Sequence, residues 1–188
     1  MKVIQTGFPG LILIEPDVFG DNRGWFMESY NYKKYSEIGI NQVFVQDNHS
    51  FSADRGTLRG LHFQNGEMAQ SKLIRCVKGS LLDVCVDLRV GSPSYMQVYS
   101  VELSEGNKKQ LFVPKGFAHG FMTLTDNVEI EYKVDQPYSK EHDSGIRYDD
   151  PSLSINWSEF VPDVEFILSE KDLSLKNISD THINFRFE

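Results

Sequence analysis

Apolar and polar residues alternate along several short stretches of this chain. These stretches are Lys72 to Lys78, Leu81 to Leu88, Tyr95 to Leu103 and Val128 to Val134, and turn-forming residues such as Gly91-Ser92-Pro93 separate them. Runs of seven to nine residues suit β-strands and fall short of the usual helix. Because the strands follow one another at close spacing, the pattern predicts an all-β sandwich or barrel.

Two stretches are candidates for short helices. Tyr32 to Ile38 is the stronger candidate, and Gly39 would end it. A weaker candidate lies near Ser169 to Leu173. We therefore expect a few short helices beside the β-structure.

The alternation also predicts which polar side chains share a face. In Leu81 to Leu88, Asp83 and Cys85 lie opposite the apolar even-numbered residues. Tyr132 points with the apolar set of its strand, and Lys72 shares a face with Ile74. A polar group among the apolar walls of a barrel is a candidate site residue. An edge-strand lysine, or a tyrosine that caps the core, would produce the same pattern.

Composition and charge narrow the class of protein. With 188 residues and 40% hydrophobic residues, the chain suits one domain, residues 1–188, with a real core. A net charge of -8 would repel a nucleic acid, so an anionic ligand needs a local cluster of Arg and Lys. We expect no signal peptide in residues 1–10 and no membrane span. Cys76 and Cys85 form no CxxC pair and are expected to be buried thiols of a cytoplasmic protein.

Two of the five histidines have distinctive surroundings. His119 follows Pro114 and Gly116 in a run similar to the later sequence box of cupin barrels, Pro-x-Gly-x-x-His. A metal-binding cupin would place a second His two residues after His62 and a Glu shortly beyond, but Gln64 stands there and Glu67 is one place short of the register. This ligand set is incomplete for a transition metal, so we expect no catalytic metal.

Without a metal, His62 and His119 must act as acids, bases or hydrogen-bond donors. An ordinary imidazole pKa of about 6.5 suits general-base work near neutral pH. A carboxylate usually orients such a base, and Asp83 and Asp172 are available. The sequence does not pair them, and Asp172 could equally be a helix cap.

Several stretches of the chain match one family, in the family's order from about residue 4 to residue 172. The chain resembles the dTDP-4-dehydrorhamnose 3,5-epimerases, which are cupin-fold enzymes. The matching stretches are Arg23-Gly24-Trp25-Phe26-Met27-Glu28, Val45-Gln46-Asp47-Asn48-His49-Ser50, Leu58-Arg59-Gly60-Leu61-His62-Phe63-Gln64, Asp83-Val84-Cys85-Val86-Asp87-Leu88-Arg89, Pro114 to Phe121, Glu131-Tyr132-Lys133 and Leu168 to Asp172.

The resemblance implies a catalytic role for each matching residue. His62 is the expected general base, and Asp172 is its orienting carboxylate. Tyr132 is the expected acid on the opposite face of the sugar, and Lys72 is the cation beside the 4-keto oxygen. The resemblance adds a second, supporting dyad, His119 with Asp83.

The resemblance also implies substrate contacts. Contacts to the nucleotide sugar are expected at Arg23, Glu28, Gln46, Asp47, Asn48, Arg59 and Lys171. Arg23 and Arg59 would hold the diphosphate, although without the family each is equally a surface salt-bridge partner. Phe26 and Tyr138 would flank the thymine ring. The family often has Glu where this chain has Asp143, a shorter carboxylate at an expected ligand contact.

The implied activity is inversion of a dTDP-linked 4-keto-6-deoxyhexose at C3 and C5, without a cofactor and in a homodimer. The nearest alternatives are an epimerase of a single carbon and an epimerase of another nucleotide-linked 4-keto sugar. A sugar-binding cupin without activity would not need an opposed acid and base such as Tyr132 and His62. A metal-dependent cupin isomerase or oxygenase would need the first metal box, which is broken here.

Overall fold

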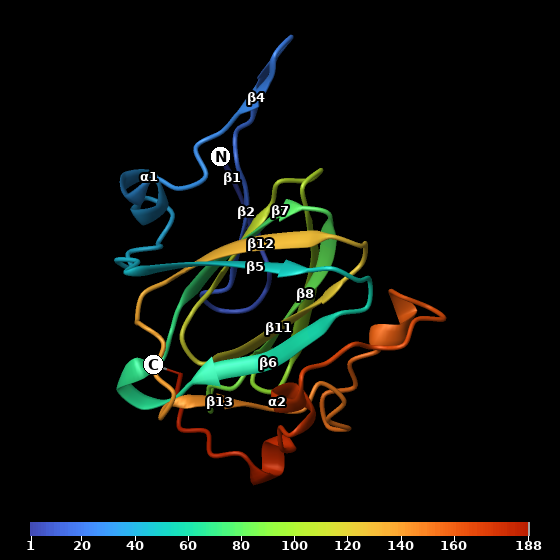
Figure 1. Cartoon of the computed structure of the whole chain (residues 1–188). Coiled ribbons are helices and arrows are strands. Elements are labelled where there is room, and N and C mark those ends of the chain that lie inside the picture. The colour runs from blue at the N-terminus through green and yellow to red at the C-terminus, as the bar shows by residue number, and fades with distance from the viewer. Residues whose placement is uncertain (188) are drawn as a thin grey trace.

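Two antiparallel β-sheets face each other in the computed structural model, which describes residues 1–187 (Figure 1). The six-stranded sheet has the order β1 (Lys2–Gln5), β2 (Ile12–Glu15), β10 (Gln110–Val113), β7 (Lys72–Lys78), β12 (Val128–Val134) and β5 (Gln46–Ser52). The five-stranded sheet has the order β13 (Asp143–Gly145), β6 (Leu58–Gln64), β11 (Phe117–Thr123), β8 (Ser80–Asp87) and β9 (Val98–Ser104). The all-β fold class predicted from the alternation is therefore confirmed.

The main core lies between the two sheets and is built from alternate residues of their strands. It contains Leu13, Ile74, Leu81, Cys85, Leu103, Leu111, Phe117, Phe121 and Ile130, all buried. Tyr132 packs against this cluster and is only half-buried. The interior is thus apolar, and any polar side chain within it is a candidate site residue.

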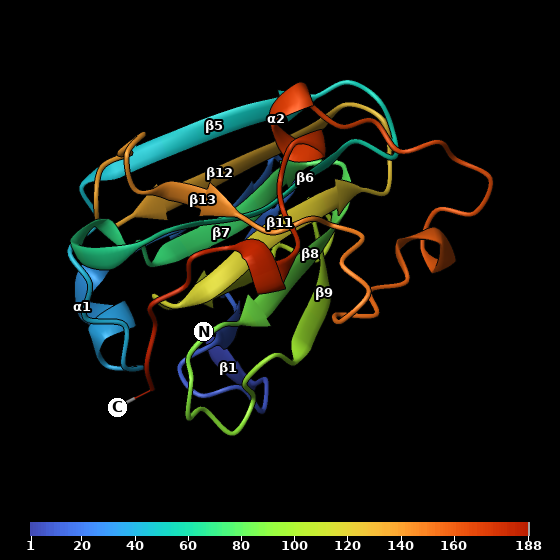
Figure 2. The ribbon, with the colours of Figure 1, turned by 90° about the horizontal axis from the view of Figure 1, so that it is seen from below.

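The C-terminal segment covers the outer face of the five-stranded sheet (Figure 2). Leu153, Trp157 and Val161 pack there in one cluster with Leu82 and Val84 of β8. Strand β8 is therefore buried on both faces, with its even-numbered residues under the C-terminal segment. Its odd-numbered residues Asp83 and Cys85 lie on the opposite face, toward the barrel interior, as the alternation predicts.

The predicted strands are confirmed, with shifts at their ends. The largest shift is in the stretch expected from Tyr95, because β9 begins only at Val98. Residues before it form a turn, with Met96 at a φ of 64° and the Gln97 amide donating to the Ser94 carbonyl at 2.9 Å. A turn residue with positive φ cannot continue a strand.

The helices are short. They are α1 (Tyr32–Ser36), α2 (Glu170–Leu173) and the 3₁₀ turns η1 (Gly66–Met68), η2 (Trp157–Glu159) and η3 (Ile178–Asp180). Asn31 caps the start of α1 at the predicted Tyr32, but the helix ends at Ser36, two residues before the predicted Ile38, and Gly39, at a φ of 91°, lies in the turn that follows. None of the described helices has the length and apolar character needed to cross a membrane.

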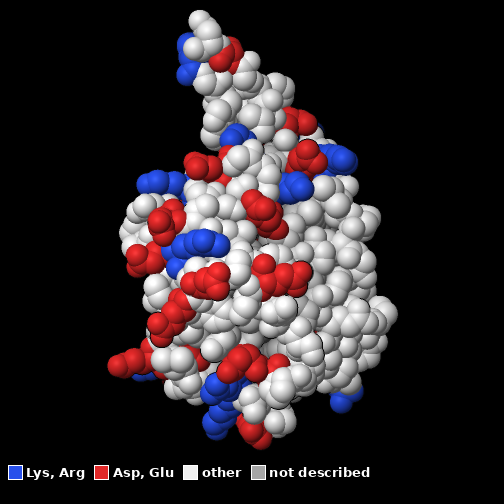
Figure 3. All heavy atoms as spheres, turned by 90° about the vertical axis from the view of Figure 1, so that its right-hand side faces the viewer, with Lys and Arg blue, Asp and Glu red and all other residues white. Residues whose placement is uncertain are grey.

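A small hairpin extends from the barrel as an arm, made of β3 (Phe19–Asp21) and β4 (Gly24–Phe26). It stands out from the body in two views (Figures 1 and 3). Phe19 is 65% exposed, Trp25 58% and Phe26 65%. Three large aromatic side chains on so short a hairpin form an exposed apolar surface, which the rest of residues 1–187 leaves largely uncovered apart from Lys108 over the Trp25 ring.

Both cysteines are buried free thiols, as expected from their spacing. Burial raises the pKa of Cys76 to about 11 and raises the pKa of Cys85 as well. Cys76 lies in β7 and contacts backbone carbonyls of Lys78 and Gly79, whereas Cys85 lies in β8 near Asp83.

Candidate active site

A pocket of about 300 Å³ lies between the two sheets. The five-stranded sheet contributes Arg59, His62 and His119, and the six-stranded sheet contributes Lys72 and Tyr132. The start of α2 closes one side with Ser169, Lys171 and Asp172. An adjoining hollow of about 220 Å³ shares His62, Lys72, Tyr132 and Lys171 and adds Gln46, Asn48, Gln64, Tyr138 and Asp143.

His62 and Asp172 form the first dyad of this pocket. The Nε2 atom of His62 lies 2.5 Å from Oδ1 of Asp172, and the Ser169 hydroxyl donates to Oδ2 at 2.8 Å. Burial raises the pKa of Asp172, but the hydrogen bonds from His62 and Ser169 outweigh it and hold the pKa below its usual range. Asp172 is therefore an ionised carboxylate that orients the imidazole.

Ser169 is a site residue that the sequence reasoning did not identify. It is the N-cap of α2, where its hydroxyl accepts from the Asp172 backbone amide at 3.1 Å. The signal was present as Ser169-x-x-Asp172, the spacing of a capping box. The cap fixes the first turn of α2 and with it the carboxylate that faces His62.

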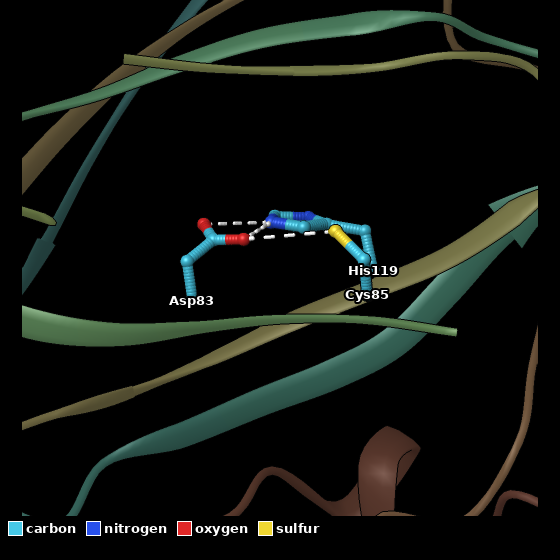
Figure 4. A group of neighbouring side chains, drawn as sticks. All are labelled: Asp83, Cys85 and His119. Atoms are coloured by element: carbon cyan, nitrogen blue, oxygen red, sulfur yellow. Dashed lines mark hydrogen bonds and ion pairs between the residues drawn. The ribbon is translucent and has the colours of Figure 1, made fainter. Parts of the chain in front are cut away.

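His119 and Asp83 form the second dyad. Oδ2 and Oδ1 of Asp83 lie 2.9 and 3.0 Å from Nε2 of His119 (Figure 4). In the sheet register, β11 places His119 opposite His62 of β6 on one side and opposite Cys85 of β8 on the other. The two histidine–carboxylate pairs that the sequence left open are thus settled as contacts.

Lys72 and Tyr132 complete the inner part of the pocket from the six-stranded sheet. Burial lowers the pKa of Lys72 and raises the pKa of Tyr132. The hydroxyl of Tyr132 is therefore protonated at neutral pH and can donate a proton. Among residues 1–187, Lys72 forms no ion pair, unlike the exposed Arg23 and the half-buried Lys133.

Cationic groups also stand at the edge of the pocket. Arg59 is exposed, and its guanidinium donates to the Phe51 carbonyl at 3.1 Å rather than to any carboxylate of the described chain. Lys171 pairs with Asp143, which also accepts from the Tyr138 hydroxyl at 3.0 Å. This acidic chain therefore concentrates cations at one place, as an anionic ligand requires.

Gln46 and Asn48 of β5, two of the predicted substrate contacts, lie near the pocket and are held there by hydrogen bonds. The Gln46 amide donates to Asn48 Oδ1 at 2.8 Å, and its Oε1 accepts from the Tyr138 backbone amide at 3.2 Å. Tyr138 is 58% exposed beside them. These residues and Asp143 line one hollow, as expected for a common ligand surface.

Four predicted substrate contacts lie away from the pocket of their own chain. Arg23 and Phe26 are on the arm, where Arg23 pairs with Asp21. Glu28 pairs with Lys34 of α1. Asp47 points to the outer face of β5, where it accepts from Lys133 at 2.8 Å. The structure therefore does not bring Arg23 and Arg59 together within one chain.

The residues of the broken metal box have other contacts. Gln64 is buried, and its amide donates to the carbonyls of Met68 and Pro137 while its oxygen accepts from Ser139. Glu67 is exposed on η1. Gln64 therefore braces the loop that carries Tyr138, and the donor set of a first-box metal site is not assembled.

Another hollow, of about 200 Å³, lies on the outer face of the six-stranded sheet. Its charged groups neutralise each other, since Arg75 pairs with Glu131 at 2.6 Å and Lys133 with Asp47. The inner pocket, with its unpaired cations and two dyads, is the better candidate for chemistry.

Comparison with known proteins identifies the family. The family model described as dTDP-4-dehydrorhamnose 3,5-epimerase matches residues 5–180. The chain is 49% identical over 175 residues to the dTDP-4-dehydrorhamnose 3,5-epimerase of Sinorhizobium fredii, covering 93% of this chain and 88% of that one. The chain belongs to the dTDP-4-dehydrorhamnose 3,5-epimerase family. It is therefore an isomerase, as the sequence motifs predict.

Solved structures of the epimerase family share this fold. The enzyme from Bacillus anthracis, with TDP and PPi bound, has a TM-score of 0.90 and 50% identity, covering 94% of this chain and 99% of that one. The enzyme from Legionella pneumophila, in complex with dTDP-4-keto-L-rhamnose, has a TM-score of 0.92 and 40% identity, covering 100% and 98%. These neighbours confirm the predicted cupin-type jelly roll.

Proposed function

We propose that this epimerase converts dTDP-4-dehydro-6-deoxy-D-glucose to dTDP-4-dehydro-L-rhamnose by inverting C3 and C5. The observation that carries the proposal is the placement of an oriented base, His62 with Asp172, on one sheet and of Tyr132 on the other. A relative with the same fold binds dTDP-4-keto-L-rhamnose. Inversion requires two groups on opposite sides of one carbon, and this pocket offers both.

The first step is removal of a proton beside the ketone. The 4-keto group acidifies the hydrogens at C3 and C5, because the resulting carbanion is delocalised onto oxygen as an enolate. His62 accepts the proton, and ionised Asp172 stabilises the imidazolium that forms. Lys72 supplies positive charge where the enolate oxygen develops negative charge.

The second step is delivery of a proton to the other face. Tyr132 gives its hydroxyl proton to the carbon, and the ketone re-forms. The tyrosinate then regains a proton from solvent, and the His62 imidazolium releases its proton to solvent. The positive charges of Arg59 and Lys171 favour the tyrosinate, since both lower the pKa that burial raises. The same pair of groups then acts on the second carbon after the sugar ring shifts in the pocket.

Arg59 and Lys171 support binding of the diphosphate. Both stand at the edge of the pocket, and Arg59 is free of carboxylate partners in the part of the chain that the structure describes. Tyr138, Gln46 and Asn48 line the adjoining hollow, where they suit the nucleoside. Asp143 would act through Lys171 and Tyr138, which both contact it.

We propose further that the working form is a homodimer in which the arm of one subunit reaches the pocket of its partner. Phe26 and Arg23 match nucleotide contacts of the family, yet they lie on an exposed arm away from their own pocket. An exposed aromatic hairpin needs a covering surface, and a second copy supplies one.

Mixed dimers test this exchange of arms. Arg23→Ala and His62→Asn subunits each carry one lesion, and in a mixed dimer one pocket receives an intact arm and an intact base. Mixing the two inactive proteins at low substrate concentration should restore activity. No recovery, with mixed dimers detected by mass spectrometry, would contradict the exchange.

We propose that residues 1–188 work as one cupin domain in the cytoplasm, without a catalytic metal. The buried thiols Cys76 and Cys85 suit a reducing compartment. The C-terminal segment packs on the barrel and supplies Asp172, so it belongs to the same unit.

Product analysis tests the activity itself. The protein is incubated with dTDP-4-dehydro-6-deoxy-D-glucose, and separately with GDP- and CDP-linked 4-keto sugars, and products are identified by NMR. We expect inversion at both C3 and C5 with the dTDP sugar. Inversion at a single carbon, or preference for another nucleotide, would favour the alternatives, and no turnover of any sugar would favour a binding protein.

A further inference from the structure

Asp83, Cys85 and His119 form a cluster of three metal-binding side chains in the barrel wall (Figure 4). The side chain of Asp83 and the thiol of Cys85 are fully buried, and His119 is 8% exposed where it lines the active-site pocket. Their ligand atoms all lie within 4.8 Å of one another. The cluster shares no strand with Gln64 or Glu67, where the first box of a metal cupin would stand.

Sheet geometry brings the three side chains together. Cys85 of β8 is the direct partner of His119 in β11, so the two side chains point to the same side of the sheet. Asp83 is two residues before Cys85 and shares its face. All three groups therefore lie on rigid strands, which suits a preformed ligand set.

The separations are close to those of a tetrahedral metal site. Zinc bonds of about 2.1 Å to N and O and about 2.3 Å to S place neighbouring ligand atoms about 3.3 to 3.6 Å apart. The His119 Nε2 to Asp83 distances are 2.9 and 3.0 Å, and Cys85 Sγ is 3.8 Å from Asp83 Oδ1. These two separations differ from the metal-bound values by a few tenths of an ångström, and the third, between Cys85 and His119, is within 4.8 Å.

We propose that Asp83, Cys85 and His119 bind a thiophilic divalent cation of the zinc class and that its binding inhibits the enzyme. On binding, the Cys85 thiol releases its proton to solvent as the sulfur–metal bond forms, and neutral His119 shifts its ring proton from Nε2 to Nδ1 and donates the Nε2 lone pair. The carboxylate and the thiolate together balance the charge of the dication. Water fills the fourth position, as in zinc sites with three protein ligands.

Inhibition follows from what the ion would displace. Metal bonds replace the hydrogen bond between His119 and Asp83. The second dyad then no longer faces the sugar site as a hydrogen-bonded pair. This part rests on the proposed function, whereas binding of the ion does not. The test therefore has one readout of binding and another of activity.

Cobalt titration of the chelator-treated dimeric protein measures binding. Co²⁺ bound by a thiolate gives a charge-transfer absorption in the near ultraviolet, and we expect it to saturate at one ion per chain. A matched pair of variants locates the ligand: Cys85→Ser should abolish the band, and Cys76→Ser, the same change at the other buried thiol, should keep it. Zn²⁺ affinity, measured by competition with a chromogenic chelator, should be weakened about tenfold or more in Cys85→Ser, because loss of even an outer-shell partner costs about tenfold.

Several outcomes would overturn the site. Absence of the band in wild type, or its persistence in Cys85→Ser with loss in Cys76→Ser, would do so. If Cys85→Ser fails to fold by circular dichroism, Asp83→Asn replaces it, with the expectation that cobalt affinity falls. For activity, Zn²⁺ should inhibit wild type and Cys76→Ser reversibly and spare Cys85→Ser. Binding without inhibition would uphold the site and contradict its effect on catalysis.

Discussion

His62 and Tyr132 face one pocket from different sheets of the barrel. His62 belongs to β6 of the five-stranded sheet, and Tyr132 belongs to β12 of the six-stranded sheet. In the proposed mechanism, a sugar ring held between the sheets meets His62 as the base on one face and the Tyr132 phenol on the other. On the proposed mechanism, this relationship allows one pocket to remove a proton and return another with inversion.

Replacing His62 should stop the reaction at its first step. His62→Asn removes the base but keeps a polar side chain of similar size, so both proton exchange and epimer formation should fall by about a hundred- to ten-thousandfold. Steady-state assay and NMR in heavy water measure the two. His49→Asn, a change of the same kind on the outer face of β5, is the control and should leave both rates near wild type.

Replacing Arg59 should weaken binding of free dTDP. Hydrogen bonds to charged groups contribute about 1.5–3 kcal/mol each, so Arg59→Ala should raise the Kd about ten- to a hundredfold. Isothermal titration calorimetry measures it, with circular dichroism to verify the fold. Arg55→Ala is the matched control, because Arg55 is an exposed arginine just before β6 that does not line the pocket. Equal affinities in wild type and Arg59→Ala would place the diphosphate elsewhere.

Asp172 should contribute to stability in a pH-dependent way. Its pKa is lower in the folded protein than in the unfolded chain, so its ionised form stabilises the fold above about pH 4. This contribution disappears as the pH falls through the folded pKa. Asp172→Asn should therefore cost about 1–3 kcal/mol near neutral pH and progressively less in acid.

Urea unfolding at several pH values checks this expectation. The control is Asp163→Asn, which removes an exposed carboxylate and should change stability little at any pH. A cost for Asp172→Asn that grows as the pH falls would show that the sign of the linkage is wrong.

Activity should not require a metal ion. The first-box ligand set is incomplete, since Gln64 is engaged with backbone groups and Glu67 is exposed. Exhaustive chelation followed by assay should leave kcat unchanged. Loss of activity that one specific divalent ion restores would contradict the proposed mechanism.

The alternation of apolar and polar residues predicted much of the site, because every second residue of a barrel strand faces the interior. Asp83 and Tyr132 stand on the inward faces of their strands, where a period of two places them. The predicted start of β9 at Tyr95 was wrong because the local alternation of residues continues through Tyr95. The turn at Met96 instead depends on hydrogen bonds to other segments of the same chain.

Pairings between distant residues could not be predicted from pattern. His62 and Asp172 are 110 residues apart, and only the packing of the C-terminal segment on the sheet makes them neighbours. The family resemblance suggested this pair, and the structure shows the contact. The position of Arg23 could not be predicted from the local sequence either. The sequence of a hairpin does not specify the direction in which the hairpin projects.

The roles of the two proton-transfer groups are tested most directly by Tyr132→Phe. This change keeps the ring and deletes only the hydroxyl, while Tyr99→Phe, on β9 and outside the pocket lining, is its control. Deuterium incorporation at C3 and C5 and formation of the inverted sugar are followed in parallel in heavy water. We predict that Tyr132→Phe keeps exchange while inversion falls by about a hundredfold or more, because the base still forms the enolate. Loss of exchange as complete as in His62→Asn, or normal inversion, would contradict the assignment of Tyr132 as the acid on the opposite face.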